Sequence, residues 1–229
     1  MIIHAPAAMK TLLCTTALFL AAAFARADLT IEQKMESAVL NGNMTMKIKG
    51  DNARMDMPSP VGGNVTVIMD MKSGDMTTLM HAQKMAMKMN LSDAKKQAEA
   101  AQKLAGIDPA KVEKPKATGT KEKVGEWDTE VYEFNMGGTT GKIWVAKDFP
   151  DAQAIKDQMS KLNNAASAGF DPSKMDVPGM TVKTQITTPV GAMTTTLIKV
   201  SQDPVPDTEF VLPPGYTEMK MPTLPGAKK

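Results

Sequence analysis

The chain has 229 residues, with 21 methionines, one cysteine and a formal net charge of +2 at pH 7. Lys10 and Arg26 account for that charge, because residues 28–229 carry 25 Lys and Arg against 25 Asp and Glu. A segment without net charge lacks the basic surface that nucleic acid or an anionic membrane attracts. We therefore expect neither of them as a partner.

Residues 1–27 have the pattern of a secretory signal peptide. Lys10 precedes an apolar stretch over residues 11–24, and residues 25–27 place two alanines where a signal peptidase reads small side chains. The stretch is too short to span a bilayer as a helix. We expect cleavage after this segment and a periplasmic location, with an uncut membrane anchor as the alternative. Cys14 would leave with the signal, so no thiol or disulfide would remain.

Alternating apolar and polar residues predict six strands between residues 28 and 90. Turn sequences such as Asn41-Gly42-Asn43 separate them. Side chains two positions apart on a strand point to the same face, and methionines recur at this spacing. They are Met44, Met46, Met55, Met57, Met69, Met71, Met85, Met87 and Met89. The pattern predicts an antiparallel meander with one buried face.

The remaining chain predicts two helices and four more strands. Ser92 is a suitable N-cap for a helix over residues 92–105, whose apolar stripe is made of alanines. Residues 107–121 are rich in Pro, Lys, Gly and Thr, which predicts an exposed loop, with a domain boundary there as the alternative. Apolar steps of three and four predict a second helix over residues 151–167. The expected strands cover about 126–134, 142–147, 180–188 and 192–201; residues 28–221 would form a single domain, and 222–229 a disordered tail.

Three segments together resemble a known group of exported domains. They are Lys49–Met57, Ile143–Asp148 and Phe210–Tyr216. They resemble uncharacterised periplasmic families related to the lipoprotein carrier and receptor proteins of the bacterial lipoprotein localisation pathway. The resemblance implies a mainly β (α+β) fold, in which an open, curved antiparallel sheet or half-barrel wraps around two main helices. It also implies an apolar cavity for acyl chains, which in this chain would be rich in methionine.

The methionine pattern predicts a non-catalytic binding protein. Methionine side chains are flexible and polarizable, so they can repack around a lipid, an acyl chain or a hydrophobic segment of a partner protein. The second helix would form the opposite wall of the cavity. The candidate lining residues are Met46, Met55, Met57, Met69, Met87, Ile155 and Met159.

Two alternatives explain the same methionines. Thioethers are soft ligands that suit Cu(I), so adjacent strands could bring sulfurs together around copper, with His81 as a further ligand. The methionines could also fill an ordinary core, since burying each is worth roughly 1.5–3 kcal/mol. The protein would then be a structural or interaction domain without a ligand. We predict no cofactor.

Catalytic constellations are absent from the sequence pattern, and we predict no enzyme activity. His81, the one histidine outside the predicted signal, is expected in a solvated turn without a serine or acidic motif around it. Glu126, Asp128 and Glu130 alternate along one strand and share a solvated face. Nothing near them would raise the pKa of one carboxyl for acid catalysis.

Overall fold

A computed structural model of the protein describes residues 28–59, 62–104, 112–136, 139–166, 175–188 and 191–220. The predicted signal peptide and the predicted disordered tail lie outside these residues, and so do residues 107–111 of the predicted loop.

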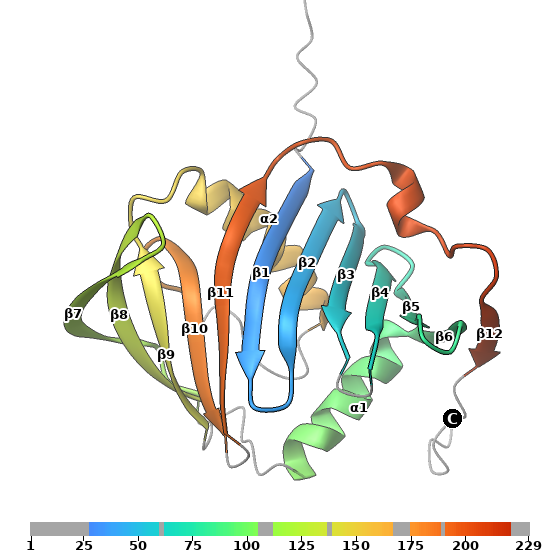
Figure 1. Ribbon diagram of the computed structural model, residues 1–229, viewed down its shortest axis with the longest axis horizontal. Helices are drawn as coiled ribbons and strands as arrows, with labels where there is room; N and C mark the ends of the chain where they lie inside the picture. The colour runs from blue at the N-terminus through green and yellow to red at the C-terminus, as the bar shows by residue number, and fades with distance from the viewer. Residues whose placement is uncertain are drawn as a thin grey trace, which may run out of the picture.

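One open, curved sheet takes up every strand of the described chain (Figure 1). Its order is β12-β6-β5-β4-β3-β2-β1-β11-β10-β9-β8-β7, and all neighbours are antiparallel except β12 and β6, which are parallel. The strands are β1 (Leu29–Ser37), β2 (Asn41–Lys49), β3 (Asn52–Pro58), β4 (Asn64–Asp70), β5 (Asp75–Met80), β6 (Met85–Asn90), β7 (Lys116–Val124), β8 (Trp127–Met136), β9 (Thr139–Ala146), β10 (Met180–Thr188), β11 (Gly191–Ser201) and β12 (Thr217–Lys220). Two meanders, β1–β6 and β7–β11, are therefore joined where β1 pairs with β11.

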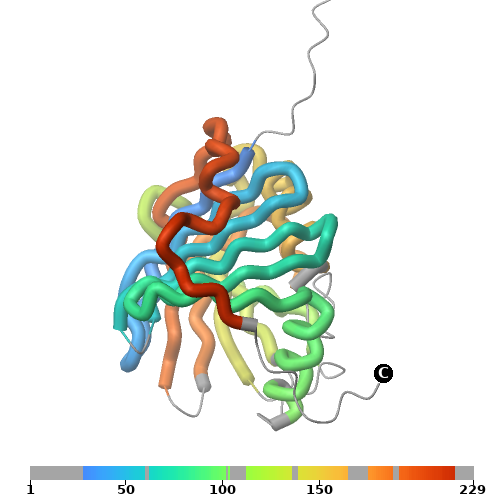
Figure 2. Tube along the Cα trace, turned by 90° about the vertical axis from the view of Figure 1, so that its right-hand side faces the viewer, coloured from blue at the N-terminus to red at the C-terminus, as the bar shows by residue number. Residues whose placement is uncertain are grey.

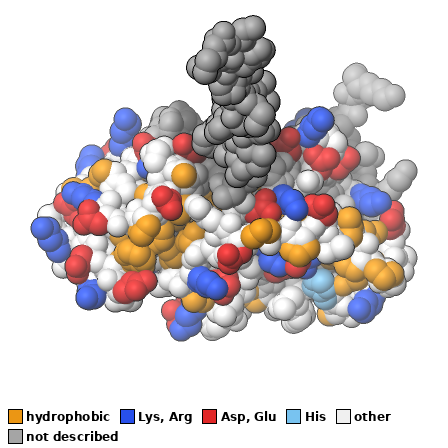
Figure 3. All heavy atoms as spheres, turned by 90° about the horizontal axis from the view of Figure 1, so that it is seen from above, with side chains coloured by type: hydrophobic (Ala, Val, Ile, Leu, Met, Phe, Trp, Pro, Cys, Tyr) orange, Lys and Arg blue, Asp and Glu red, His pale blue; other side chains and the backbone are white. Residues whose placement is uncertain are grey.

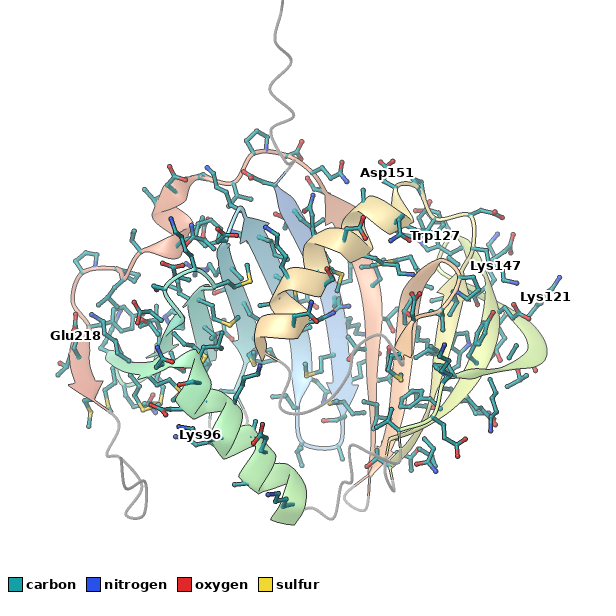
Figure 4. The ribbon with its side chains drawn as sticks, turned by 180° about the vertical axis from the view of Figure 1, so that it is seen from behind. Lys96, Lys121, Trp127, Lys147, Asp151 and Glu218 are labelled. Atoms are coloured by element: carbon teal, nitrogen blue, oxygen red, sulfur yellow. The ribbon has the colours of Figure 1, made fainter. Side chains whose placement is uncertain are left out.

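Two helices lie on the same side of the sheet. They are α1 (Leu91–Leu104) and α2 (Ala152–Ala166), and α2 crosses the sheet diagonally when it is viewed from behind (Figure 4). Ile155 and Leu162 of α2 are buried against the strands, and Met159 packs beside them, as the helical spacing predicts. The predicted fold class is confirmed: a mostly β protein with an open, curved sheet and two helices.

The main core lies between the sheet and α2. It contains residues from both meanders, among them Ile31 of β1, Trp144 of β9 and Val182 of β10. Two smaller apolar clusters lie on the other face of the sheet. One covers β8 and β9, and the other covers β4–β6.

Residues 205–216 cover that outer face of β4–β6, and we call this segment the strap. The strap leaves the end of β11, includes a short 3-10 helix (Asp207–Phe210), and crosses the strands before β12 pairs with β6 (Figure 2). Phe210, Leu212 and Tyr216 of the strap pack against the cluster of buried residues on β4–β6. The meander β2–β6 thus has the helices on one face and the strap on the other.

Two strands depart from the sequence prediction. The predicted exposed loop over residues 107–121 is wrong from Lys116 onward, because β7 begins there. Almost every side chain of β7 is exposed, so the strand shows no apolar alternation from which it could be recognised. The four-residue β12 was also missed, because it exists only through its pairing with β6.

Candidate functional site

Methionines of β2–β6 line up across the strands in three transverse rows on the helix side. The first row runs Ala53–Met69–Met76–Met89, the second Met46–Met55–Val67–Thr78–Met87, and the third Met57–Val65–Met80–Met85. Met46, Val67, Met69 and Met76 pack in the same cluster as α2, which places the rows on the helix side of the sheet. We call the nine methionines of these rows the methionine face.

The methionine face is less deeply buried than the rest of the core. Met69 is 5% exposed and belongs to the buried cluster, whereas the other eight methionines are only partly buried. In the β8–β10 half of the sheet, Val131 and Val182 of the main core are 3% and 1% exposed. Many of the sulfur atoms drawn in Figure 4 accordingly lie around β3–β6, beside α1.

Helix α1 explains why these methionines remain partly accessible. The helix contacts β6 and α2, and its first residue, Leu91, packs on the main core. Its next inward positions, Ala94 and Ala98, carry only a methyl group each. Side chains this small cover less of the sheet than the large apolar residues of α2.

The structure places the seven predicted site residues on one side of the sheet. Met69 and Ile155 are buried members of the main cluster, and Met46 and Met159 pack against it. Met55, Met57 and Met87 are partly buried at register positions of the second and third rows. Their role as a ligand-binding surface remains a prediction.

A chain of hydrogen bonds lies on the opposite face, beneath the strap. Arg54 donates from Nε and Nη2 to the two carboxylate oxygens of Asp56, each at 2.8 Å. Thr66 donates its hydroxyl to Asp56, and His81 Nε2 lies 2.7 Å from the Thr66 oxygen. His81 Nδ1 is hydrogen-bonded to the hydroxyl of Tyr216 at the end of the strap. His81 lies in a turn, as predicted, but its ring is partly buried and hydrogen-bonded on both nitrogens, so the prediction that it is solvated is wrong.

The tautomer of His81 follows from this chain. The single hydroxyl hydrogen of Thr66 goes to Asp56, so His81 Nε2 carries the hydrogen that is donated to Thr66. In the neutral imidazole, Nδ1 then accepts from the Tyr216 hydroxyl. In this series of hydrogen bonds, each donor among Thr66, His81 and Tyr216 has an acceptor. Such an arrangement links the sheet to the strap structurally.

Opposing effects set the pKa of Asp56. Burial raises the pKa of this carboxyl, but the hydrogen bonds from Arg54 and Thr66, together with the nearby positive charge, lower it further than burial raises it. The net pKa of Asp56 is below its ordinary value. The hydrogen bond to Asp56 in turn raises the pKa of Arg54.

Glu130, one of the acidic residues singled out by the sequence, is stabilised as a carboxylate by its neighbours. It forms an ion pair with Lys147 at 2.6 Å and accepts a hydrogen bond from the Tyr132 hydroxyl at 3.1 Å. The hydrogen bond from Lys147 lowers the pKa of Glu130, which is opposite to the shift that a general acid needs. Among the described residues, no group of three or more His, Cys, Asp and Glu is placed to hold a metal ion.

A separate pocket of about 410 Å³ opens at one end of β8, β9 and β10. Its lining is mainly polar, and Phe134 is its one aromatic residue. None of the seven predicted site residues lines it. Neither described helix has the length and apolar character needed to cross a membrane.

The fold and the methionine face together define a class: a mostly β protein with an open, curved sheet, two helices on its inner face and a strap on its outer face. The chain belongs to the family described as Domain of unknown function (DUF4412), whose model matches residues 29–216. The match runs from the first residue of β1 to the last residue of the strap.

Other comparisons are distant. No curated protein matches this chain. Among solved structures, the chain is similar to the Mycobacterium tuberculosis lipoprotein LppX, with 11% identity and a TM-score of 0.42, over 79% of this chain and 88% of LppX. It is also similar to PNGF-II in its C2 crystal form, with 11% identity and a TM-score of 0.37, over 85% of this chain. The chain spans only 31% of the PNGF-II chain.

Proposed function

We propose that this protein is an exported, non-catalytic binding protein that holds an apolar chain, such as the acyl chain of a lipid, against the methionine face. The observation that carries the proposal is the set of partly buried methionines in three rows on the helix side. When a ligand covers a partly accessible apolar surface, binding is favoured by roughly 25 cal/mol for each Å² removed from water.

The dimensions of the face suit an extended apolar chain. The five strands β2–β6 lie about 4.8 Å apart, so the face is about 19 Å wide across the strands. The charged side chains of these strands, such as Lys47 and Arg54, occupy the alternate positions and point to the strap side. A ligand on the methionine face would therefore meet thioethers and aliphatic groups.

The methionines suit a site that must accept more than one shape. Methionine has three rotatable bonds and specifies packing poorly, whereas the β-branched residues favoured in strands would give a rigid wall. The signal-peptide pattern of residues 1–27 and the resemblance to lipoprotein carriers support export and a lipid-like ligand. A hydrophobic segment of a partner protein is the other occupant that this surface would accept.

The proposal is tested with a fluorescent fatty acid, cis-parinaric acid, titrated into the purified protein. We expect saturable binding by the natural chain. A Met55→Asp/Met87→Asp double variant should bind at least about tenfold more weakly, a loss of about 1.4 kcal/mol or more, because two carboxylates would enter the apolar surface. Native mass spectrometry of the gently purified protein should show a co-purified lipid mass.

An Ile198→Asp variant is the matched control. Ile198 lies on β11 and is 52% exposed, so this substitution adds a carboxylate at the surface without changing the methionine face. Folding of all variants is checked by circular dichroism. Unchanged parinarate affinity in a folded Met55→Asp/Met87→Asp variant, or no saturable binding by the natural chain, would overturn the proposal.

A further inference from the structure

Three methionines of the methionine face, together with Met71 beside them, lie at one corner of the helix side of the sheet. Met69, Met76 and Met89 are consecutive members of the first row, on β4, β5 and β6. Met71 follows Met69 by two positions, and Met69, Met71 and Met76 pack in the same apolar cluster. The corner therefore brings together thioethers from three strands and a turn.

Backbone hydrogen bonds hold this corner in place. The amide of Met71 donates to the carbonyl of Asp51 at 2.8 Å, which ties the β4–β5 turn to the β2–β3 turn. The amide of Leu91 donates to the carbonyl of Gly74 at 2.7 Å, which ties the same turn to the start of α1. The backbone of the turn that carries Met71 is thus set by contacts other than the methionine side chains, and strand pairing sets that of Met69, Met76 and Met89.

The spacing of the row lets the sulfurs converge. Directly paired residues of neighbouring antiparallel strands have Cβ atoms about 4.5–5.5 Å apart. Three rotatable bonds in each side chain allow adjacent thioethers to reach a common point. Ala53 lies beside Met69 at the end of the row and is 0% exposed, so its methyl group leaves the Met69 side chain free of a bulky neighbour on that strand.

The chemistry of the corner selects a soft, monovalent cation. Thioether sulfur is a soft, uncharged ligand that suits Cu(I), whereas Mg²⁺, Ca²⁺ and Mn²⁺ require oxygen ligands. The nearest charged residues in these strands, Asp70, Asp75 and Lys88, occupy the alternate positions and so belong to the other face. Met69 is 5% exposed while Met76 and Met89 are partly accessible, so the site would be closed on one side and open on the other.

We propose that the thioethers of Met69, Met71, Met76 and Met89 bind one Cu(I) ion. The proposal does not depend on acyl-chain binding, since it concerns the first row and the adjacent turn. His81, the histidine considered as a ligand from sequence, takes no part, because it lies on the strap side in the hydrogen-bonded chain with Thr66 and Tyr216.

The test is an anaerobic Cu(I) titration of the purified protein in competition with bicinchoninate. We expect one Cu(I) per chain in the natural protein, and at least about tenfold weaker binding in a Met69→Leu/Met76→Leu/Met89→Leu variant. Leucine keeps the apolar character and approximate volume, so the variant should remain folded. With Ag(I) as a redox-inert probe, the methyl resonances of the four methionines should shift in the NMR spectrum.

A Met46→Leu/Met55→Leu/Met87→Leu variant is the matched control, because it removes three thioethers from the second row. It should bind Cu(I) as the natural chain does. No uptake by the natural chain, or equal loss in both triple variants, would overturn the copper site. Parinarate binding, measured on the same samples, should survive both sets of leucine substitutions, so failure of the copper site and failure of acyl-chain binding are distinguishable.

Discussion

Neighbouring residues of β3 point to opposite faces of the sheet. Arg54 and Asp56 point to the strap side and pair with each other, whereas Met55 and Met57 occupy the alternate positions on the helix side. Thr66, which is 0% exposed, joins the charged pair to His81 across the strands. One step along the strand therefore separates a charged, hydrogen-bonded network from an apolar surface.

An Asp56→Asn variant should reduce the free energy of unfolding at pH 7 by roughly 2 kcal/mol, because it weakens hydrogen bonds to charged groups. The pKa of Asp56 is lowered in the folded protein. Its contribution is therefore fully present above the unfolded-state pKa of about 3.9 and is lost as the pH falls through the folded-state pKa.

Urea unfolding of the natural chain and the variant at pH 7 and near pH 3 measures this effect. The difference between the two proteins should be smaller at the acidic pH. Thr129→Val is a suitable control, since the Thr129 hydroxyl on β8 donates to the backbone carbonyl of Glu122, a hydrogen bond outside the network that involves no ionisable group. An equal difference at both pH values would contradict the prediction.

At the scale of elements, the strap is held by both charge and apolar packing. Lys49 pairs with Asp207 at 2.7 Å, and Lys47 pairs with Glu209 at 2.8 Å. The amide of Val205 donates to Asp28 at 2.7 Å, where the strap begins. The strap buries an apolar cluster on β4–β6, and the chain after it pairs with β6 as β12.

A chain that stops after Pro204 should lose roughly 3–6 kcal/mol of stability, because the large side chains of Ile68 and Leu79 become exposed. Hydrogen exchange should show lost protection in β6, which becomes an edge strand, while β9 and β10 keep theirs. A chain that stops after Lys220 keeps the whole strap and is the control. Unchanged protection of β6 would show that the strap does not stabilise it.

At the scale of the whole molecule, an open sheet leaves two edges. Strand β12 forms one edge, with only four residues, and β7 forms the other. An exposed edge can pair with a second chain, and charged side chains discourage this. The side chains of β7 from Lys116 to Lys123 are exposed and include three lysines and a glutamate. Basic and acidic side chains are also interspersed over the surface seen in Figure 3.

A Lys121→Val/Lys123→Val variant should self-associate, because it makes the edge strand β7 apolar. Size-exclusion chromatography with light scattering would detect dimers or larger species at micromolar concentration. Lys142→Val/Lys199→Val removes two exposed lysines from strands with partners on both sides, so this control should elute like the natural chain. Equal association of the two variants would point to lost charge alone.

The sequence predicted those parts of the structure that depend on local periodicity. Met55 and Met57 share a face because strand side chains alternate, and Ile155 and Leu162 share a face because a helix has 3.6 residues per turn. These periods are properties of the backbone, so the strands β1–β6, the two helices and the mostly β fold could be read from the chain. The exposed β7 carries no such period and was missed.

Tertiary structure alone decided which distant residues meet. His81 and Tyr216 are 135 positions apart, and Arg54 and Glu209 are 155 apart, yet each pair is hydrogen-bonded. The rows of the methionine face likewise depend on the register between strands, which alternation within one strand does not specify. The sequence by itself determined that methionines share a face; folding decided which thioethers are neighbours and that the strap would cover the other side.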